Sequence, residues 1–146
     1  IKKIKDNAEL ILIGQGYLFD ELKEKVNNLG LQDSVKFLGL RTDIPELMQG
    51  MDLFLFPSLF EGLPVVLVEA QAAGLKCVTS TGVTKETDIT DSLEFYDLNE
   101  TPEKWAEKIV NLDTRKRNNS KLLNEKGYDS STNIKWLVDF YSKYYI

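Results

Sequence analysis

Glu9-Leu10-Ile11-Leu12-Ile13-Gly14-Gln15-Gly16 is a short, almost continuous apolar run that ends at two glycines. Such a run is typical of a strand buried on both faces, which is the usual position of strands in a parallel sheet. Leucine and valine then recur at three- and four-residue spacing over residues 18–29, and Gly30 follows them. This spacing predicts an amphipathic helix that ends at Gly30. The stretch therefore predicts the first strand–helix unit of an α/β fold.

The same alternation continues along the chain. We expect further strands at 34–38, 53–56, 76–79 and 93–96, and helices at 44–49, 64–73 and 102–112. Strands that alternate with helices predict a Rossmann-like, mostly parallel sheet with helices on both faces and right-handed crossovers. Ligands of such a fold bind beyond the carboxyl ends of the strands. We expect residues 1–112 to form this domain.

Residues 113–146 show helical patterns but no further strand. Basic residues from 115 to 126 alternate with acidic ones, which favours a solvated helix face over a binding arm. The last predicted helix, 133–144, has two apolar faces, one formed by Ile134, Leu137, Val138 and Tyr141, the other by Trp136, Phe140 and Tyr144. A single core contact cannot cover both, so we expect another part of the protein to cover the second.

The composition excludes several classes of function. The chain has 146 residues, 42% hydrophobic and 28% charged, as expected for one soluble globular domain. Its net charge of −5 argues against nucleic acid as a partner. The sequence contains no histidine, which rules out Ser-His-Asp catalysis and histidine-bound zinc within it.

Cysteine content and hydropathy point to a reducing compartment. The single cysteine, Cys77, lies in a strand-like run and is predicted to be a buried, inert thiol. No stretch approaches the roughly 20 apolar residues of a membrane span, and the first residues lack a signal-peptide core. We expect a cytoplasmic location. The sequence begins without methionine and almost directly in a strand, so we expect it to be a fragment of a longer protein.

The most informative segment for chemistry is Pro57–Ala70, which joins a predicted strand to a predicted helix through a loop that contains Glu61. Pro64 suits the first helical turn, where a missing N–H group costs nothing. The N–H groups of residues 65–67 would point out of the helix start and form an anion site. Glu69 lies inside the helix, and its side chain would lean back toward that start.

This arrangement predicts a ligand with both hydroxyl groups and phosphates. Carboxylates accept hydrogen bonds from vicinal hydroxyls, and helix N–H groups bind phosphate, so a nucleotide sugar fits both. The alternative from spacing alone is that Glu69 is a solvated helix residue and Glu61 an ordinary loop acid.

Several segments together resemble the donor-binding domain of GT-B glycosyltransferases. They are Gly14–Gly16 after a strand, Val35–Gly39, Asp52–Ser58, and Glu61-Gly62-Leu63-Pro64 followed by Glu69-Ala70. Within that fold the chain most resembles retaining family four, with its Glu-x7-Glu motif, over residues 8–112. The resemblance implies the C-terminal half of a GT-B fold without its first strand. It also implies retaining transfer of a hexose from a UDP- or GDP-sugar to a sugar or lipid-linked acceptor, in capsular or exopolysaccharide synthesis.

The resemblance also implies roles for individual residues. Glu61 would lie beside the donor sugar as the catalytic residue, and Glu69 would bind the ribose hydroxyls. The other donor-binding positions that it implies are Gly62, Leu63, Val65, Gly14, Gly16, Leu40, Arg41, Thr84 and Glu86. Among these, Leu40 and Arg41 would border the nucleobase.

The sequence departs from the family pattern at its N-terminal side. In the family, basic residues from an earlier loop neutralise the diphosphate, and a separate N-terminal domain binds the acceptor. Both are absent from this sequence. We therefore expect helix 133–144 to pack toward that domain and the complete enzyme to be cytoplasmic, or peripheral at the inner membrane face. The chain alone is expected to bind nucleotides no better than about millimolar, to transfer no sugar, and to self-associate weakly.

Other interpretations account for less of the sequence. A dinucleotide fingerprint would need a third glycine where Phe19 stands and an acidic residue after the next strand, where Gly39-Leu40-Arg41 stands. A metal-dependent GT-A enzyme would need an Asp-x-Asp motif, which does not occur, so we expect no metal and no cofactor. A non-catalytic ligand-binding module with the same fold remains open.

Overall fold

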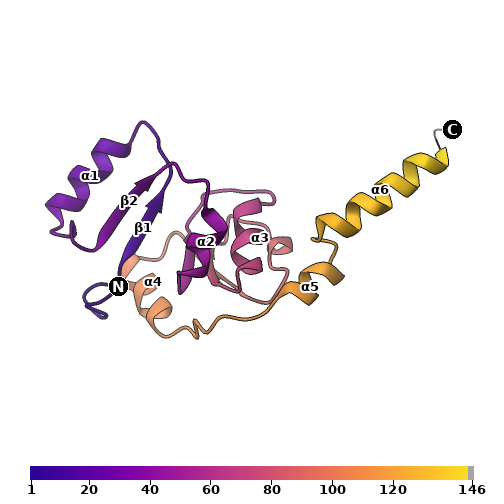
Figure 1. Ribbon diagram of the computed structural model, residues 1–146. Helices are drawn as coiled ribbons and strands as arrows, with labels where there is room; N and C mark the ends of the chain where they lie inside the picture. The colour runs from indigo at the N-terminus through magenta and orange to yellow at the C-terminus, as the bar shows by residue number, and fades with distance from the viewer. Residues whose placement is uncertain (145–146) are drawn as a thin grey trace. The chain divides into compact units, whose positions relative to one another are not determined.

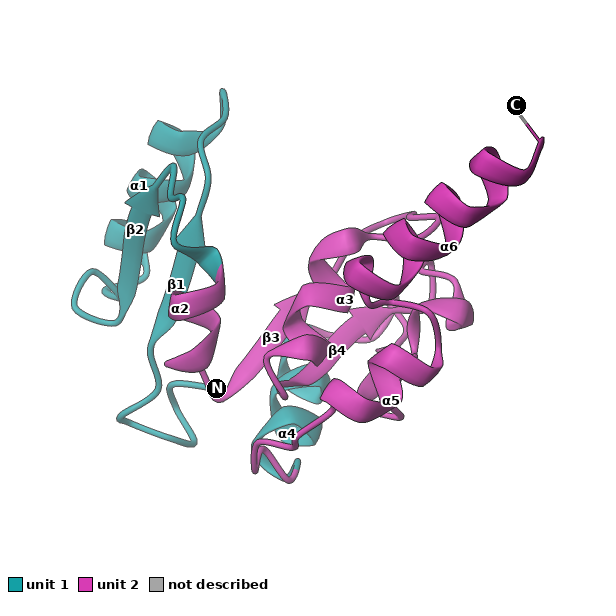
Figure 2. Cartoon of the chain, turned by 45° about the vertical axis from the view of Figure 1, so that its right-hand side comes forward, with its two compact units in different colours: residues 1–44, 102–112 teal, residues 45–101, 113–146 magenta. Residues whose placement is uncertain are grey.

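The computed structural model describes residues 1–144, which form two parallel sheets flanked by helices (Figure 1). The chain divides into two compact units, shown in different colours in Figure 2. The first comprises residues 1–44 and 102–112, and the second comprises residues 45–101 and the chain from 113 onward. The expected division of the chain after residue 112 stays a prediction. The expected alternation of parallel strands with helices is confirmed.

The first unit is built around a two-stranded parallel sheet. β1 (Leu10–Ile13) pairs with β2 (Val35–Gly39), and α1 (Phe19–Asn28) connects them. α1 lies beside this sheet (Figure 1), and the ring of Phe19 meets that of Phe37 edge to face at 5.4 Å between centroids. The helix ends before Gly30, whose φ of +65° is the left-handed conformation expected of a terminating glycine. α4 (Pro102–Val110) belongs to the same unit and buries Trp105, Ala106 and Ile109.

The prediction that the first strand is buried on both faces is wrong for the described residues. Leu10 and Ile11 are 43% and 37% exposed. The reason is the short sheet, since β1 pairs there with β2 alone and its apolar side chains are incompletely covered.

The second unit is built around a three-stranded parallel sheet in the order β3–β4–β5. α2 (Ile44–Gln49) leads into it, and β3 (Leu53–Phe56), β4 (Lys76–Ser80) and β5 (Leu93–Tyr96) form the sheet. α3 (Val65–Ala72) connects β3 to β4 and packs on both strands. The side chains at the centre of this unit are fully buried: Leu67, Ala70, Leu75, Cys77 and Val78.

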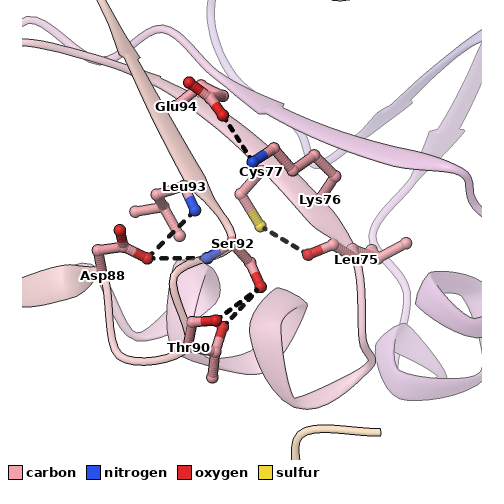
Figure 3. A network of polar contacts seen from close by, with 8 residues as sticks. All are labelled: Leu75, Lys76, Cys77, Asp88, Thr90, Ser92, Leu93 and Glu94. Carbon is pink, nitrogen blue, oxygen red and sulfur yellow. Dashed lines mark hydrogen bonds and ion pairs between the residues drawn. The ribbon is translucent and has the colours of Figure 1, made fainter. Parts of the chain in front are cut away.

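The start of β5 is fixed by a polar network (Figure 3). The Asp88 carboxylate accepts hydrogen bonds from the N–H groups of Ser92 (3.0 Å) and Leu93 (3.2 Å). The Thr90 and Ser92 hydroxyls lie 2.7 Å apart. Near the first residues of β4 and β5, Lys76 Nζ forms an ion pair with Glu94 Oε1 at 2.7 Å. The turn before β5 is therefore held by side chains as well as by the strand ladder.

Two helices follow in the second unit, α5 (Ser120–Glu125) and α6 (Ser130–Tyr144). α6 begins three residues earlier than the predicted 133. The reason is Asp129, whose carboxylate accepts hydrogen bonds from the Thr132 N–H group (3.1 Å) and the Ser131 hydroxyl (2.7 Å). Hydrogen bonds from Thr132 and Ser131 lower the pKa of Asp129 to about 2.

The apolar residues of α6 are exposed on both of its predicted faces. Trp136 is 63% and Ile134 is 58% exposed, and no residue of the described helix is buried. The expectation that another part of the protein covers the second face stays a prediction.

Cys77 is the buried thiol that the sequence predicts. It is 0% exposed, and its Sγ atom lies 3.6 Å from the Leu75 carbonyl oxygen (Figure 3). Removal from water, together with the charge of Asp88, raises the pKa of Cys77 to about 12.

We predict that Cys77 in the folded protein does not react with a thiol reagent at pH 8, because the thiol is buried and thiolate is scarce. Colorimetric titration should show one reactive thiol in denaturant. Reaction of the native protein at the rate of free cysteine would contradict this prediction.

Gly74 ends the α3 segment at a point of close backbone contact. Its φ is +79°, and a Cβ atom there would lie 2.3 Å from the Arg117 carbonyl oxygen. The Arg117 N–H group donates to the Gly74 carbonyl at 3.2 Å, so this contact joins the segment before α5 to the end of α3. Gly127 has a similar φ of +82° but no atom within 4 Å of a built Cβ.

We predict that Gly74→Ala destabilises the protein by about 2–4 kcal/mol, because left-handed strain and overpacking add. Gly127→Ala is the matched control, with strain alone, and should cost about 1 kcal/mol. Urea unfolding of both variants measures the difference. Equal losses would show that the contact with Arg117 relaxes at no cost.

Candidate functional site

Two loops leave the same edge of the three-stranded sheet. β3 ends at Phe56 and β4 ends at Ser80, and the two strands are parallel and paired. The segments 57–64 and 81–84 therefore start at neighbouring carboxyl ends, where ligands of this fold class bind. A single parallel bridge joins Glu61 to Val83, so the two loops also contact each other beyond the sheet.

Glu61 is held at this edge by its side chain and its backbone. Its Oε1 atom accepts a hydrogen bond from the Ser58 hydroxyl at 3.1 Å. Its N–H group donates to the Gly82 carbonyl at 3.4 Å. The side chain is half-buried. Glu61 is therefore a carboxylate of defined position that a ligand can reach.

The loop of Glu61 is tied to the end of β4 by residues that sequence reasoning missed. The buried Ser80 hydroxyl donates to the Ser58 carbonyl and accepts the Gly82 N–H group at 3.1 Å. The Thr79 hydroxyl donates to the Phe56 carbonyl at 2.9 Å. A Cβ atom at Gly82 would lie 2.0 Å from the Leu59 carbonyl oxygen, so this position requires glycine. The available signal was a glycine three residues after a predicted strand.

The start of α3 differs in detail from the prediction. Pro64 is the residue before the helix, with φ −70° and ψ 111°, and the helix begins at Val65. The Leu67 N–H group donates to the Pro64 carbonyl at 3.0 Å, so it is not free, because this first turn closes on Pro64. In the part of the chain that the structure describes, the N–H groups of Val65 and Val66 have no backbone partner. Within the described residues, the anion site at this helix start therefore offers two free N–H donors, one fewer than predicted.

The remaining residues of the Glu-x7-Glu segment are accessible. Glu69 is exposed in the second turn of α3, and Gly62 is exposed with open space around it. Leu63 is 49% and Val65 is 66% exposed. The backbone at Gly62, Leu63 and Val65 can therefore be approached by a ligand.

Thr84 and Glu86 lie on a segment that is fastened to α3. Thr84 caps the short 3-10 helix η1 (Lys85–Thr87) by accepting the Glu86 N–H group at 3.5 Å. The Glu86 side chain is exposed. The segment is anchored by Gln71, two residues after Glu69 on the same helix.

Gln71 is a buried polar residue that sequence reasoning also missed. Its Nε2 group donates to the carbonyl oxygens of Leu67 (3.0 Å) and Thr87 (2.8 Å), and its Oε1 accepts the N–H groups of Ile89 (2.9 Å) and Thr90 (3.1 Å). One side chain thereby hydrogen-bonds backbone groups of Thr87, Ile89 and Thr90 and holds this segment against α3. Its signal in the sequence is one amide on an otherwise apolar helix face.

The other candidate residues lie in the first unit, at the carboxyl ends of β1 and β2. Gly14 has a φ of +130°, and its N–H group donates to the Gly39 carbonyl at 2.8 Å. Open space surrounds Gly16, and Leu40 is 73% exposed. The Arg41 guanidinium hydrogen-bonds the Asp43 carboxylate at 2.8 Å. This contact raises the pKa of Arg41 and lowers that of Asp43.

Residues 1–144 contain no cluster of three or more His, Cys, Asp or Glu side chains that could hold a metal ion. The expectation that no metal takes part stays a prediction. None of the described helices combines the length and the apolar character needed to cross a membrane.

Comparison with known proteins gives consistent relatives. The chain is 39% identical to EpsF of Bacillus subtilis (strain 168) over 139 residues, which cover 92% of this chain and 36% of that protein. It is 38% identical over 75 residues to an Escherichia coli UDP-Gal:α-D-GlcNAc-diphosphoundecaprenol α-1,3-galactosyltransferase, covering 51% of this chain and 19% of that enzyme. The chain thus spans about a third or less of the length of these relatives.

Solved structures show the same fold. Anabaena HepE in complex with UDP-glucose superposes with a TM-score of 0.71 at 26% identity, over 92% of this chain and 41% of that one. The lipopolysaccharide glycosyltransferase WaaG superposes with a TM-score of 0.65 at 25% identity, over 75% of this chain and 30% of that one. The family model described as "Glycosyl transferases group 1" matches residues 1–114. The chain therefore belongs to the group 1 glycosyltransferases, with the α/β architecture of their GT-B fold.

Proposed function

We propose that this chain is the donor-binding part of a longer, retaining glycosyltransferase that takes a hexose from a UDP-sugar. The acceptor is a sugar or a lipid-linked sugar in the synthesis of a cell-surface polysaccharide. The rest of that enzyme supplies the acceptor-binding domain and the basic side chains that neutralise the diphosphate. The reaction takes place on the cytoplasmic side and uses no metal ion and no nucleic acid.

The observation that carries this proposal is the fixed Glu61 loop beside the start of α3. Glu61 is anchored at the carboxyl edge of the sheet, and two helix N–H groups of α3 are open to an anion. A sugar hydroxyl binds to a hydrogen-bond acceptor of defined position, and a diphosphate binds to N–H donors at the positive end of a helix dipole. The Glu-x7-Glu segment supplies both within one strand–loop–helix unit.

The relatives support the choice of uridine over guanosine. The HepE structure was solved with UDP-glucose, and the name of the Escherichia coli relative specifies UDP-Gal.

Transfer with retention gives a product whose anomeric configuration equals that of the donor. Proton NMR of the purified product measures it, and an inverted product would overturn this part of the proposal.

A non-catalytic binding module remains the second candidate, since the fold alone does not establish catalysis. Calorimetric titration of the complete protein with UDP, GDP and NAD separates the alternatives. Binding of UDP with transfer activity supports the enzyme, whereas NAD binding or the absence of nucleotide binding supports another module.

We predict that Glu69→Ala in the complete enzyme raises the donor Kd by about 10- to 100-fold. The ribose hydroxyls lose a charged acceptor, whose hydrogen bonds are worth about 1.5–3 kcal/mol. Calorimetry with a non-hydrolysable UDP-sugar measures the change. Glu107→Ala is the control, because Glu107 is an exposed helical glutamate on α4 to which the proposal gives no role. Equal donor affinities of the Glu69 variant and the parent would remove Glu69 from ribose binding.

We predict that Glu61→Gln lowers kcat by about 10-fold or more and changes the donor KM by less than about threefold. The substitution keeps the shape and removes the charge, so it acts where charge develops in the transition state. Steady-state kinetics of UDP release measures both constants. An unchanged kcat would place Glu61 away from the reacting centre.

A further inference from the structure

The Glu61 carboxylate is held through one of its two oxygens. Ser58 Oγ lies 3.1 Å from Glu61 Oε1, and its one other acceptor within residues 1–144 is the Phe60 carbonyl at the longer distance of 3.5 Å. Within the described residues no hydrogen bond or ion pair to Glu61 Oε2 is found. A hydroxyl that donates to a carboxylate makes a charge-assisted hydrogen bond, which is stronger and more directional than a neutral one. Ser58 therefore fixes the rotation of the carboxyl group and leaves the second oxygen for a ligand.

Ser58 is itself fixed through its backbone. Its N–H group donates to the Phe56 carbonyl at 2.9 Å, and its carbonyl accepts the hydroxyl of the buried Ser80. Ser80 also accepts the Gly82 N–H group, and Gly82 leaves no room for a side chain beside Leu59. Ser58, which orients Glu61, is thus tied by its carbonyl to the buried end of β4.

From these contacts we infer that Ser58 is a positioning residue for Glu61, which holds the carboxylate so that Oε2 faces the donor sugar. This inference rests on the proposed function, in which Glu61 lies beside that sugar. Without the hydroxyl the carboxylate rotates among several orientations, and the productive one is populated for only part of the time. The donor itself does not contact Ser58 and binds as before.

Ser58→Ala in the complete enzyme is the test. We expect kcat to fall about tenfold, equivalent to about 1.4 kcal/mol, while the donor KM and the unfolding temperature change little. Ser58→Thr keeps the hydroxyl and should recover most of the rate. This split between kcat and KM, together with the rescue, separates positioning from a general loss of structure.

Thr79→Val is the matched structural control. It deletes a hydroxyl that ties the same loop region to β4 through the Phe56 carbonyl, and within the described residues this hydroxyl has no hydrogen bond to Glu61. We expect a lower unfolding temperature with kcat close to that of the parent. If Thr79→Val lowers kcat as much as Ser58→Ala does, the effect comes from loop stability and the positioning role is wrong.

Glu61→Gln in the same assay keeps the two proposals distinguishable. If Glu61→Gln is impaired and Ser58→Ala retains kcat within about twofold, the positioning inference fails and the proposed function stands. If Glu61→Gln retains full kcat, the assignment of Glu61 fails, and the inference about Ser58 fails with it.

Discussion

The close approach of the loop after β3 to the turn after β4 is the constraint on which the site depends. The Leu59 carbonyl occupies the space where a side chain at residue 82 would stand, so only glycine permits the approach. Once the two backbones are this close, Ser80 reaches the Ser58 carbonyl and Glu61 forms its bridge with Val83. The buried sheet thereby extends its order into a loop that has no regular secondary structure, and a carboxylate on that loop acquires a defined position.

A second buried polar contact, made by Gln71, holds the segment of Thr84 and Glu86 against α3. The Gln71 amide is fully buried, and both of its polar atoms are satisfied by backbone groups of Thr87, the last residue of η1, and of Ile89 just after it. A buried amide without partners would destabilise the fold by about 1–3 kcal/mol, so these hydrogen bonds are obligatory once the side chain is inside. α3 therefore carries Glu69 outward and anchors the segment of Thr84 and Glu86 inward. In the second unit, the candidate residues are therefore held by hydrogen bonds between residues far apart in the sequence.

The local pattern of the sequence determined much of this protein. Alternating apolar runs and amphipathic stretches predicted every strand of the described chain and most helix boundaries to within two residues, because hydrophobic periodicity is a local property of the sequence. Gly30 and Gly74 ended helices as expected, since each adopts a positive φ. The Glu-x7-Glu segment indicated the glycosyltransferase family, which the match over residues 1–114 confirms.

What only the tertiary structure decided are the contacts between segments far apart in the chain. Ser80 and Ser58 are separated by 22 residues, and Gln71 and Thr87 by 16, so no local period relates them. The pairing of Leu67 with Pro64, which removes one predicted anion donor, depends on how tightly the first turn of α3 closes. The exposure of α6 likewise depends on what packs against it, whereas its apolar pattern specifies only that a partner surface is needed. Sequence thus determined which segments fold and which chemistry they carry, and the packing of parallel strands decided which side chains hold that chemistry in place.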